Sequence, residues 1–203
     1  MRKYIKRIII CAVITAFLGG ISVLADRRLL SEELIRLHVV ANSDREDDQL
    51  LKLKVRDAVI QGLQEDLKQM SDVDAARNYL LKNISKIQSI ANKTLNAAGG
   101  EESAVVTLCR ETFDVRHYDT FSLPAGVYES LRIVIGEGKG KNWWCVAFPA
   151  LCLPATVNDF KDMAVGAGFS EDLCSTLSGD TRYEFRFFLL DAMGRLENIL
   201  FEG

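Results

Sequence analysis

The chain has 203 residues and a formal net charge of −3 at pH 7. This length is enough to bury one hydrophobic core and predicts one domain rather than two. The acidic balance argues against the basic patches that bind nucleic acid or anionic lipid, so no nucleic-acid partner is expected.

The first 25 residues have the three parts of an export signal. The opening MRKYIKR carries four basic residues and no acid, and residues 8 to 25 carry no charge. Val23 and Ala25 occupy the two positions that a signal peptidase reads, which predicts cleavage before Asp26. Because 18 apolar residues can also span a bilayer, an uncleaved membrane anchor is the alternative.

In both cases residues 26 to 203 are expected to lie beyond the membrane as a single exported α+β domain. Loss of residues 1 to 25 would remove four basic residues and change the net charge from −3 to −7. Membrane contact is expected only through residues 1 to 25, if they are uncleaved.

A strand followed by two helices is predicted for the first half of this domain. Residues 34 to 40, LIRLHVV, alternate so that Ile35, Leu37 and Val39 share one face. Ser43 and Glu46 have the spacing of a capping box and predict a helix start. Two apolar stripes at helical spacing then predict two helices packed on a sheet. The first stripe consists of Leu51, Val55, Ala58, Val59 and Gly62. The second helix is predicted to start near Ser71 or Asp72 and to end at Gly99 and Gly100, with a stripe of Val73, Ala76, Leu80, Ile84, Ile87 and Ala91.

After residue 100, runs rich in β-branched and aromatic residues predominate. They predict strands at residues 104–109, 113–121, 128–135, 143–148 and 182–190. The motif LPAG at residues 123–126 predicts a β-turn, and SEDLCSTL predicts a short helix. The predicted fold class is α+β: a strand, two long helices, then a mainly antiparallel sheet with helices packed on one face.

Residues 136 to 141, GEGKGK, have the composition of a phosphate-binding loop but not its spacing. A Walker loop needs four residues between its glycines, and a dinucleotide fingerprint needs a glycine at position 141, which is Lys141. Both motifs open a helix, whereas a strand-like run follows here. The glycines therefore predict a hairpin turn or bulge, and no cofactor is expected.

No catalytic residue and no metal ligand are expected from the histidines and cysteines. His38 and His117 form no cysteine-enzyme signature with Cys145. The four residues His38, Cys109, His117 and Cys145 do not have the spacing of any zinc site.

A Cys145–Cys152 disulfide is predicted, because the exported part holds four cysteines in an oxidising compartment. It would close an eight-residue loop, and the entropy of loop closure predicts a stabilisation of the folded state by roughly 2.5 kcal/mol. Buried free thiols are the alternative. Cys109 and Cys174 are a candidate second pair, or else two buried small hydrophobic residues.

Trp143 and Trp144 are adjacent, so a strand places them on opposite faces. One can enter the core. The other becomes a rigid amphipathic anchor of the kind that interfaces favour, unless a second layer of helices covers it. The candidate partner-binding residues are Gly136, Gly138, Gly140, Asn142, Trp143 and Trp144, with His38, Asn42 and Asp44 from the first strand and the polar loop after it.

Two long segments resemble one known family. LIRLHVVANSDREDDQLLKLKVRDAV (34–59) and LPAGVYESLRIVIGEGKGKNWWCVAFPALCL (123–153) are similar to stage II sporulation protein R of endospore-forming bacteria. The resemblance covers roughly residues 30 to 190 and is weakest at 155–180 and after 190.

This resemblance implies a signalling protein that is made in the forespore and secreted into the space between the two membranes. There the family activates a membrane-embedded aspartic protease of the mother cell, which removes the pro-sequence of the mother-cell sigma factor. The family is not known as an enzyme. An envelope-acting hydrolase that uses an acid such as Glu137, and an anchored structural protein of the intermembrane space, stay open as alternatives.

Overall fold

The computed structural model describes residues 2–149, 157–166, 168–180 and 184–203. In the described residues, a helix and a strand are followed by two helices, a run of five strands and three further helices, and the predicted α+β class is confirmed. In chain order the elements are α1 (Arg2–Glu33), β1 (Ile35–Val40), α2 (Glu46–Lys68), α3 (Val73–Ala97), β2 (Ala104–Phe113), β3 (Arg116–His117), β4 (Ser122–Leu123), β5 (Gly126–Ile135), β6 (Asn142–Phe148), α4 (Val157–Gly166), α5 (Glu171–Leu177) and α6 (Glu184–Glu202).

The main sheet has four strands in the order β2-β5-β1-β6. β1 runs parallel to β5, while the β1–β6 and β2–β5 pairs are antiparallel. β1 therefore lies between β5 and β6, and the glycine loop that joins them is a connection across the end of β1. The predicted hairpin is wrong, because local spacing cannot reveal that a distant strand separates the two.

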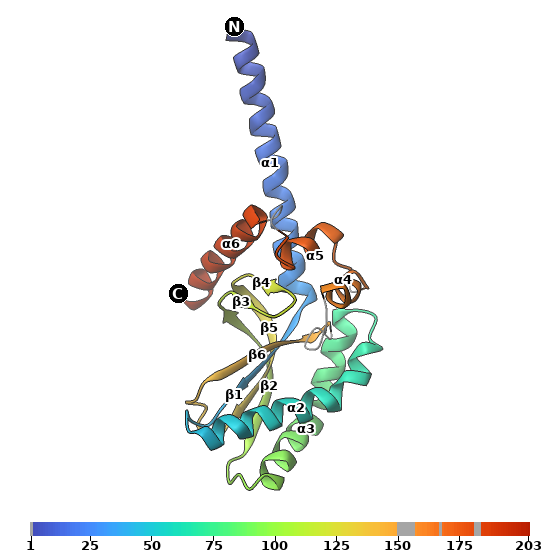
Figure 1. The fold of residues 1–203 in the computed structure, drawn as a ribbon, viewed down its shortest axis with the longest axis vertical. Coiled ribbons are helices and arrows are strands. Elements are labelled where there is room, and N and C mark those ends of the chain that lie inside the picture. The colour runs from blue at the N-terminus through green and yellow to red at the C-terminus, as the bar shows by residue number, and fades with distance from the viewer. Residues whose placement is uncertain (1, 150–156, 167, 181–183) are drawn as a thin grey trace.

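α2 and α3 cover one face of this sheet, as predicted (Figure 1). Ile35, Leu37 and Val39 of β1 lie on this face in the core with the predicted stripe of α3. Asp72 caps α3, since its Oδ1 accepts a hydrogen bond from Ala75 N at 2.8 Å. The apolar alternation of the first strand and the stripes of both helices thus determine a closed core.

The start of α2 differs from the predicted capping box. Arg45 is the N-cap residue, and its side chain makes no capping hydrogen bond. Ser43 lies outside the helix and donates its hydroxyl to Asp48 Oδ2 at 2.5 Å.

A second set of helices packs on the opposite face of the sheet. α1, α4, α5 and α6 form a second core there with strand residues that include Phe113, Tyr128 and Val146. Helices therefore cover both faces of the sheet, whereas the sequence predicts helices on one face only. The predicted strand at 182–190 is wrong where the structure describes it, because α6 begins at Glu184.

Close backbone packing explains why α6 is helical despite its aromatic residues. Gly194 lies directly against β5, where an added Cβ would come 1.6 Å from Ala125 O. Leu190, one turn earlier, is fully buried. Contacts with a distant strand therefore override a local composition typical of β-structure.

α1 runs without a break past the predicted cleavage site and projects from the body as one long helix (Figure 1). Its last turns belong to the second core through Val23 and Leu30. Asp26 and Arg27 are buried and form ion pairs with Arg186 and Glu197 of α6. Within the described residues, no helix has the length and apolarity needed to cross a membrane. Cleavage before Asp26 stays a prediction.

Candidate functional site

The glycine loop and the loop after β1 lie against each other, and we call residues 41–45 and 136–141 together the loop junction. Lys139 N donates to Asn42 O at 3.0 Å, and Gly140 N donates to Ala41 O at 2.9 Å. Lys141 N donates to Asp44 Oδ1 at 2.7 Å. The structure thus brings the predicted residues Asn42 and Asp44 together with the predicted glycines.

Asn42 is the centre of the loop junction, and both the oxygen and the nitrogen of its side-chain amide form hydrogen bonds within the protein. Its Oδ1 accepts from Glu137 N at 2.9 Å, and its Nδ2 donates to Asp48 Oδ2 and Glu102 Oε1, each at 3.2 Å. Because both ends of the amide are engaged, Asn42 holds the loop in shape rather than offering free hydrogen-bonding groups to a ligand.

The glycines of the loop junction are required by its backbone. Gly136 and Gly138 have φ of 56° and 64°, a region that other residues rarely adopt. Gly140 packs so closely that an added Cβ would lie 2.2 Å from Ser43 O. These residues therefore shape a rigid connection, and the loop does not open a helix as a phosphate-binding loop does.

Lys52 of α2 binds the loop junction through a backbone carbonyl group. Its buried ammonium donates to Lys141 O at 2.9 Å and to Gln49 Oε1 at 2.7 Å. Burial lowers the pKa of Lys52, and the charge of Asp44 acts in the opposite direction. The loop is thus held by a cation that points inward.

Trp143 and Trp144 lie on opposite faces of β6, as predicted. Trp143 is 37% exposed on the face covered by α2, where the Arg56 guanidinium carbon lies 4.1 Å from its ring centroid. Trp144 is half-buried on the other face, stacked on His38 with ring centroids 3.7 Å apart. Trp143 is therefore the tryptophan that a partner can reach, next to the exposed Asn142 and Lys141.

His38 and Trp144 belong to a second group of predicted residues, apart from the loop junction. His38 Nδ1 lies 3.0 Å from both carboxylate oxygens of Glu111. Arg132 Nε lies 3.9 Å from Glu111 Oε2, and the Arg116 guanidinium carbon lies 5.0 Å from the Trp144 ring centroid. We call His38, Glu111, Arg116, Arg132 and Trp144 the polar cluster.

The electrostatics of the polar cluster favour an ionised Glu111 carboxylate that is held by its neighbours. Burial raises the pKa of Glu111, but the hydrogen bond and charge of His38 and the charge of Arg132 outweigh it, so the pKa is lower than usual. His38 is 4% exposed, and its Nε2 is buried without a hydrogen-bond partner. A substrate in solvent therefore has no direct access to this imidazole.

Glu111, Arg116 and Arg132 were not predicted as site residues. They lie on different strands, and the β2–β5 and β1–β5 registers bring Arg132 beside His38. The alternation of β2 in the sequence places Glu111 on the face opposite to Ala104 and Val106. Only the strand order shows that Glu111 contacts His38 rather than His117.

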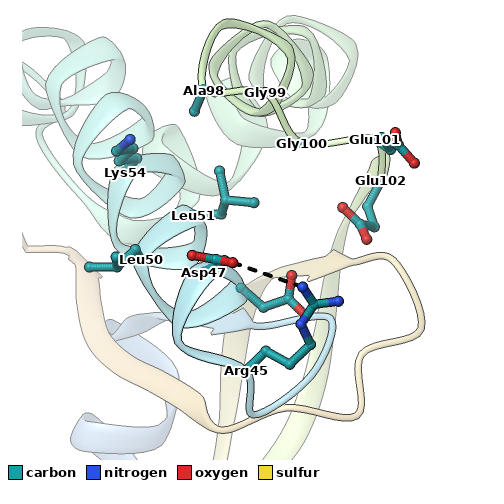
Figure 2. Close-up of a pocket in the computed structure, with 11 residues that line it drawn as sticks. Arg45, Asp47, Leu50, Leu51, Lys54, Ala98, Gly99, Gly100, Glu101 and Glu102 are labelled. Carbon is teal, nitrogen blue, oxygen red and sulfur yellow. Dashed lines mark ion pairs between the residues drawn. The ribbon is translucent and has the colours of Figure 1, made fainter.

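A hollow of about 380 Å³ lies beside the first turns of α2 (Figure 2). Residues of both charges line it, and Arg45 pairs with Asp47 across its rim at 3.8 Å. None of the predicted site residues lines it. Within the described part of the chain, no group of three or more His, Cys, Asp or Glu residues could hold a metal ion.

The described thiols and the candidate acid are poor catalysts. Burial raises the pKa of the Cys109 and Cys174 thiols, both of which are free, so the candidate second disulfide is wrong. The exposed Glu137 has a lowered pKa because Lys139 hydrogen-bonds to it at 2.6 Å, whereas a general acid needs a raised one. Cys152 lies outside the described residues, so its pairing with Cys145 stays a prediction.

Comparison with known proteins identifies the family. The sequence profile described as Stage II sporulation protein R matches residues 31–158, which is more than half of the chain. The chain belongs to the stage II sporulation protein R family. A protein of Bacillus subtilis (strain 168) described as Stage II sporulation protein R is 35% identical over 158 residues, covering 72% of this chain and 70% of that protein. No solved structure matches the chain significantly.

The matched region contains the whole main sheet with α2 and α3. It includes the loop junction, the polar cluster and both tryptophans. α5 and α6 lie beyond the match, and so does most of α1. The candidate site therefore lies within the region that the family profile matches, whereas α5, α6 and most of α1 lie outside that match.

Proposed function

We propose that the chain is an exported, non-catalytic signalling protein of sporulation. It activates a membrane-embedded aspartic protease of the mother cell, which then matures the precursor of the mother-cell sigma factor. The observation that carries this proposal is the match of residues 31–158 to the stage II sporulation protein R family. That membership supports a role in sporulation, and the protease is the partner that the family resemblance implies.

The chemistry of the site supports binding over catalysis. The lowered pKa of Glu137 makes this residue a poor general acid for the hydrolase alternative. The raised pKa of Cys109 disfavours the thiolate that a nucleophile needs, and His38 Nε2 is buried.

The proposed contact surface is centred on Trp143. Its indole is exposed, adjoins Asn142 and Lys141, and stands on a strand that pairs with β1. The loop junction behind it is fixed by backbone hydrogen bonds and by Lys52. A rigid aromatic anchor loses little conformational entropy on binding, which favours affinity.

Activation requires that this surface bind the active arrangement of the protease more tightly than the inactive one. A ligand with equal affinity for both arrangements changes neither population. Secretion across the forespore membrane into the intermembrane space, with or without retention through residues 8–25, would bring the surface to the outward face of that protease.

Reconstitution in a non-sporulating host tests the function. The chain is co-expressed with the candidate protease and the sigma-factor precursor, with and without residues 1 to 25. We expect precursor cleavage only when the chain is exported. Equal cleavage by the form without residues 1 to 25 would contradict the proposal.

Exchange of Trp143 for Ala tests the surface. We expect normal abundance and secretion but at least a ten-fold loss of precursor cleavage, since buried aromatic anchors at interfaces contribute about 2 kcal/mol or more. Leu81→Ala is the matched control, because Leu81 is also a large exposed apolar residue but lies on α3. Normal cleavage by the Trp143→Ala variant would remove Trp143 from the surface while leaving the function untouched.

A further inference from the structure

α6 carries a second apolar face that points away from the sheet. Phe185 is 73% exposed, Phe188 63%, Leu196 58% and Ile199 68%. With the exposed Ala192, these residues recur every three or four positions, which places them on one side of a helix. We call these five residues the α6 stripe.

The described residues leave most of the α6 stripe uncovered. The opposite side of α6 supplies the packing, through the buried Leu190 and through Gly194 against β5. On that side Asp191 Oδ1 accepts a hydrogen bond from Ala125 N at 2.9 Å, and Glu197 pairs with Arg27 of α1. A helix that is apolar on its second side as well is typical of a buried helix, so something outside the described residues is expected to cover it.

The area of the α6 stripe fits a protein interface. A fully accessible large apolar residue presents roughly 150–250 Å², so the stripe with the adjacent Leu200, itself 75% exposed, presents on the order of 600 Å². This is at the upper limit of the largest apolar patch on an ordinary monomer, about 300–600 Å². It approaches the roughly 800 Å² that each partner contributes to a stable complex.

The charges beside the α6 stripe argue against a lipid surface as its occupant. Helices that lie on membranes carry lysine and arginine on their polar side. Here the exposed residues at the two ends of the stripe are Glu184 and Glu202. The one exposed basic residue of α6, Arg195, is paired with Asp191 at 2.8 Å.

We propose that the α6 stripe is the interface with a second copy of this chain. Two-fold pairing covers the same face on both copies at once, and it is the commonest symmetry of soluble oligomers. The small Ala192 lies in the middle of the stripe, where it allows two helices to cross at the close distance of about 8–10 Å. This dimer goes beyond the proposed function and does not depend on it.

Cysteine cross-linking of the full-length, exported chain tests the dimer. An Ala192→Cys variant places a thiol at the helix crossing for either direction of the partner helix. After mild oxidation we expect most of this variant to migrate on a non-reducing gel with twice the mass of the monomer. Leu81→Cys is the matched control, because Leu81 is exposed to a similar degree on α3 and is expected to remain monomeric.

A second change separates pairing from chance collision. Adding Leu196→Glu to the Ala192→Cys variant should reduce the cross-linked fraction at least ten-fold, with unchanged thermal unfolding because Leu196 is mostly exposed. Equal cross-linking with and without this change, or equal cross-linking by Leu81→Cys, would overturn the dimer. A covalent product of any mass other than twice the monomer would overturn it too, by showing that a different protein occupies the stripe.

Discussion

The two faces of the main sheet differ in the kinds of side chain that are buried on them. The face toward α2 and α3 is closed by apolar side chains such as Leu37, Val39 and Ile133. The other face combines an apolar and aromatic core with buried polar groups, namely Arg36, His38 and the Glu111 carboxylate. Burial of apolar surface stabilises both faces without directional requirements, but the buried polar groups of the second face also need specific partners in specific positions.

Arg36 shows what the second face requires. Its side chain is fully buried, yet its hydrogen-bond acceptors are the neutral Cys145 O at 3.2 Å and Tyr118 Oη at 2.9 Å. The Phe113 ring lies 4.3 Å from the guanidinium carbon and compensates part of the lost hydration. Such a face is specific rather than strongly stabilising, which suits it to orienting the β3–β4 hairpin that supplies Tyr118.

The largest expected effect separates the two faces directly. Leu131→Ala removes a fully buried side chain from the α2–α3 core and should lower the free energy of unfolding by about 3 kcal/mol. Val105→Ala, at the exposed end of the other face, should change it by less than about 0.5 kcal/mol. Urea unfolding of both variants measures the difference, and similar losses would contradict the placement of Leu131 in a closed core and of Val105 at an exposed edge.

A smaller effect is expected at the loop junction, where β1 ends and β6 begins. Gly140→Ala would place a Cβ 2.2 Å from Ser43 O, so the loops must separate, at a cost of about 2 kcal/mol. Gly166→Ala is the matched control, since nothing lies within 4 Å of the added Cβ. Thermal unfolding should show a lower midpoint for Gly140→Ala alone, and equal midpoints would refute a rigid junction.

The smallest effect probes the polar cluster and depends on pH. Glu111→Gln removes the carboxylate that pairs with His38 and should lower the free energy of unfolding at pH 7 by about 1–2 kcal/mol. Because the folded pKa of Glu111 is depressed, its stabilisation is present above the unfolded value near 4.5 and is lost as pH falls through the folded pKa. The stability difference from the wild type should therefore shrink below about pH 4.5, and a constant difference would show that the charge of the Glu111 carboxylate does not stabilise the fold.

Much of the fold was predictable because its signals are local. The cap at Asp72, the stripe of α3 and the end of that helix at the left-handed Gly99 follow from neighbouring residues. The strand prediction for residues 113–121 was too long, since β2 continues to Phe113 and only the short β3 and β4 follow. The composition of α6 predicts a strand because its packing against the start of β5 depends on residues about 70 positions away.

The candidate site divides in the same way. The opposite orientation of Trp143 and Trp144 follows from the period of a strand and was predicted. That Asn42 holds the glycine loop, and that Glu111 faces His38, depends on β1 lying between β5 and β6.

Between residues 34 and 100, the sequence by itself determined which segments are helical or extended and which residues form the α2–α3 core. It also determined the family. Short-range periodicity and long unusual segments carry that information. Only the tertiary structure decided the strand order, the helical state of α6 and the separation of the candidate residues into a loop junction and a polar cluster. The physical reason is that strand pairing and helix docking are contacts between residues far apart in the chain, and their geometry is set by the packing of the whole domain.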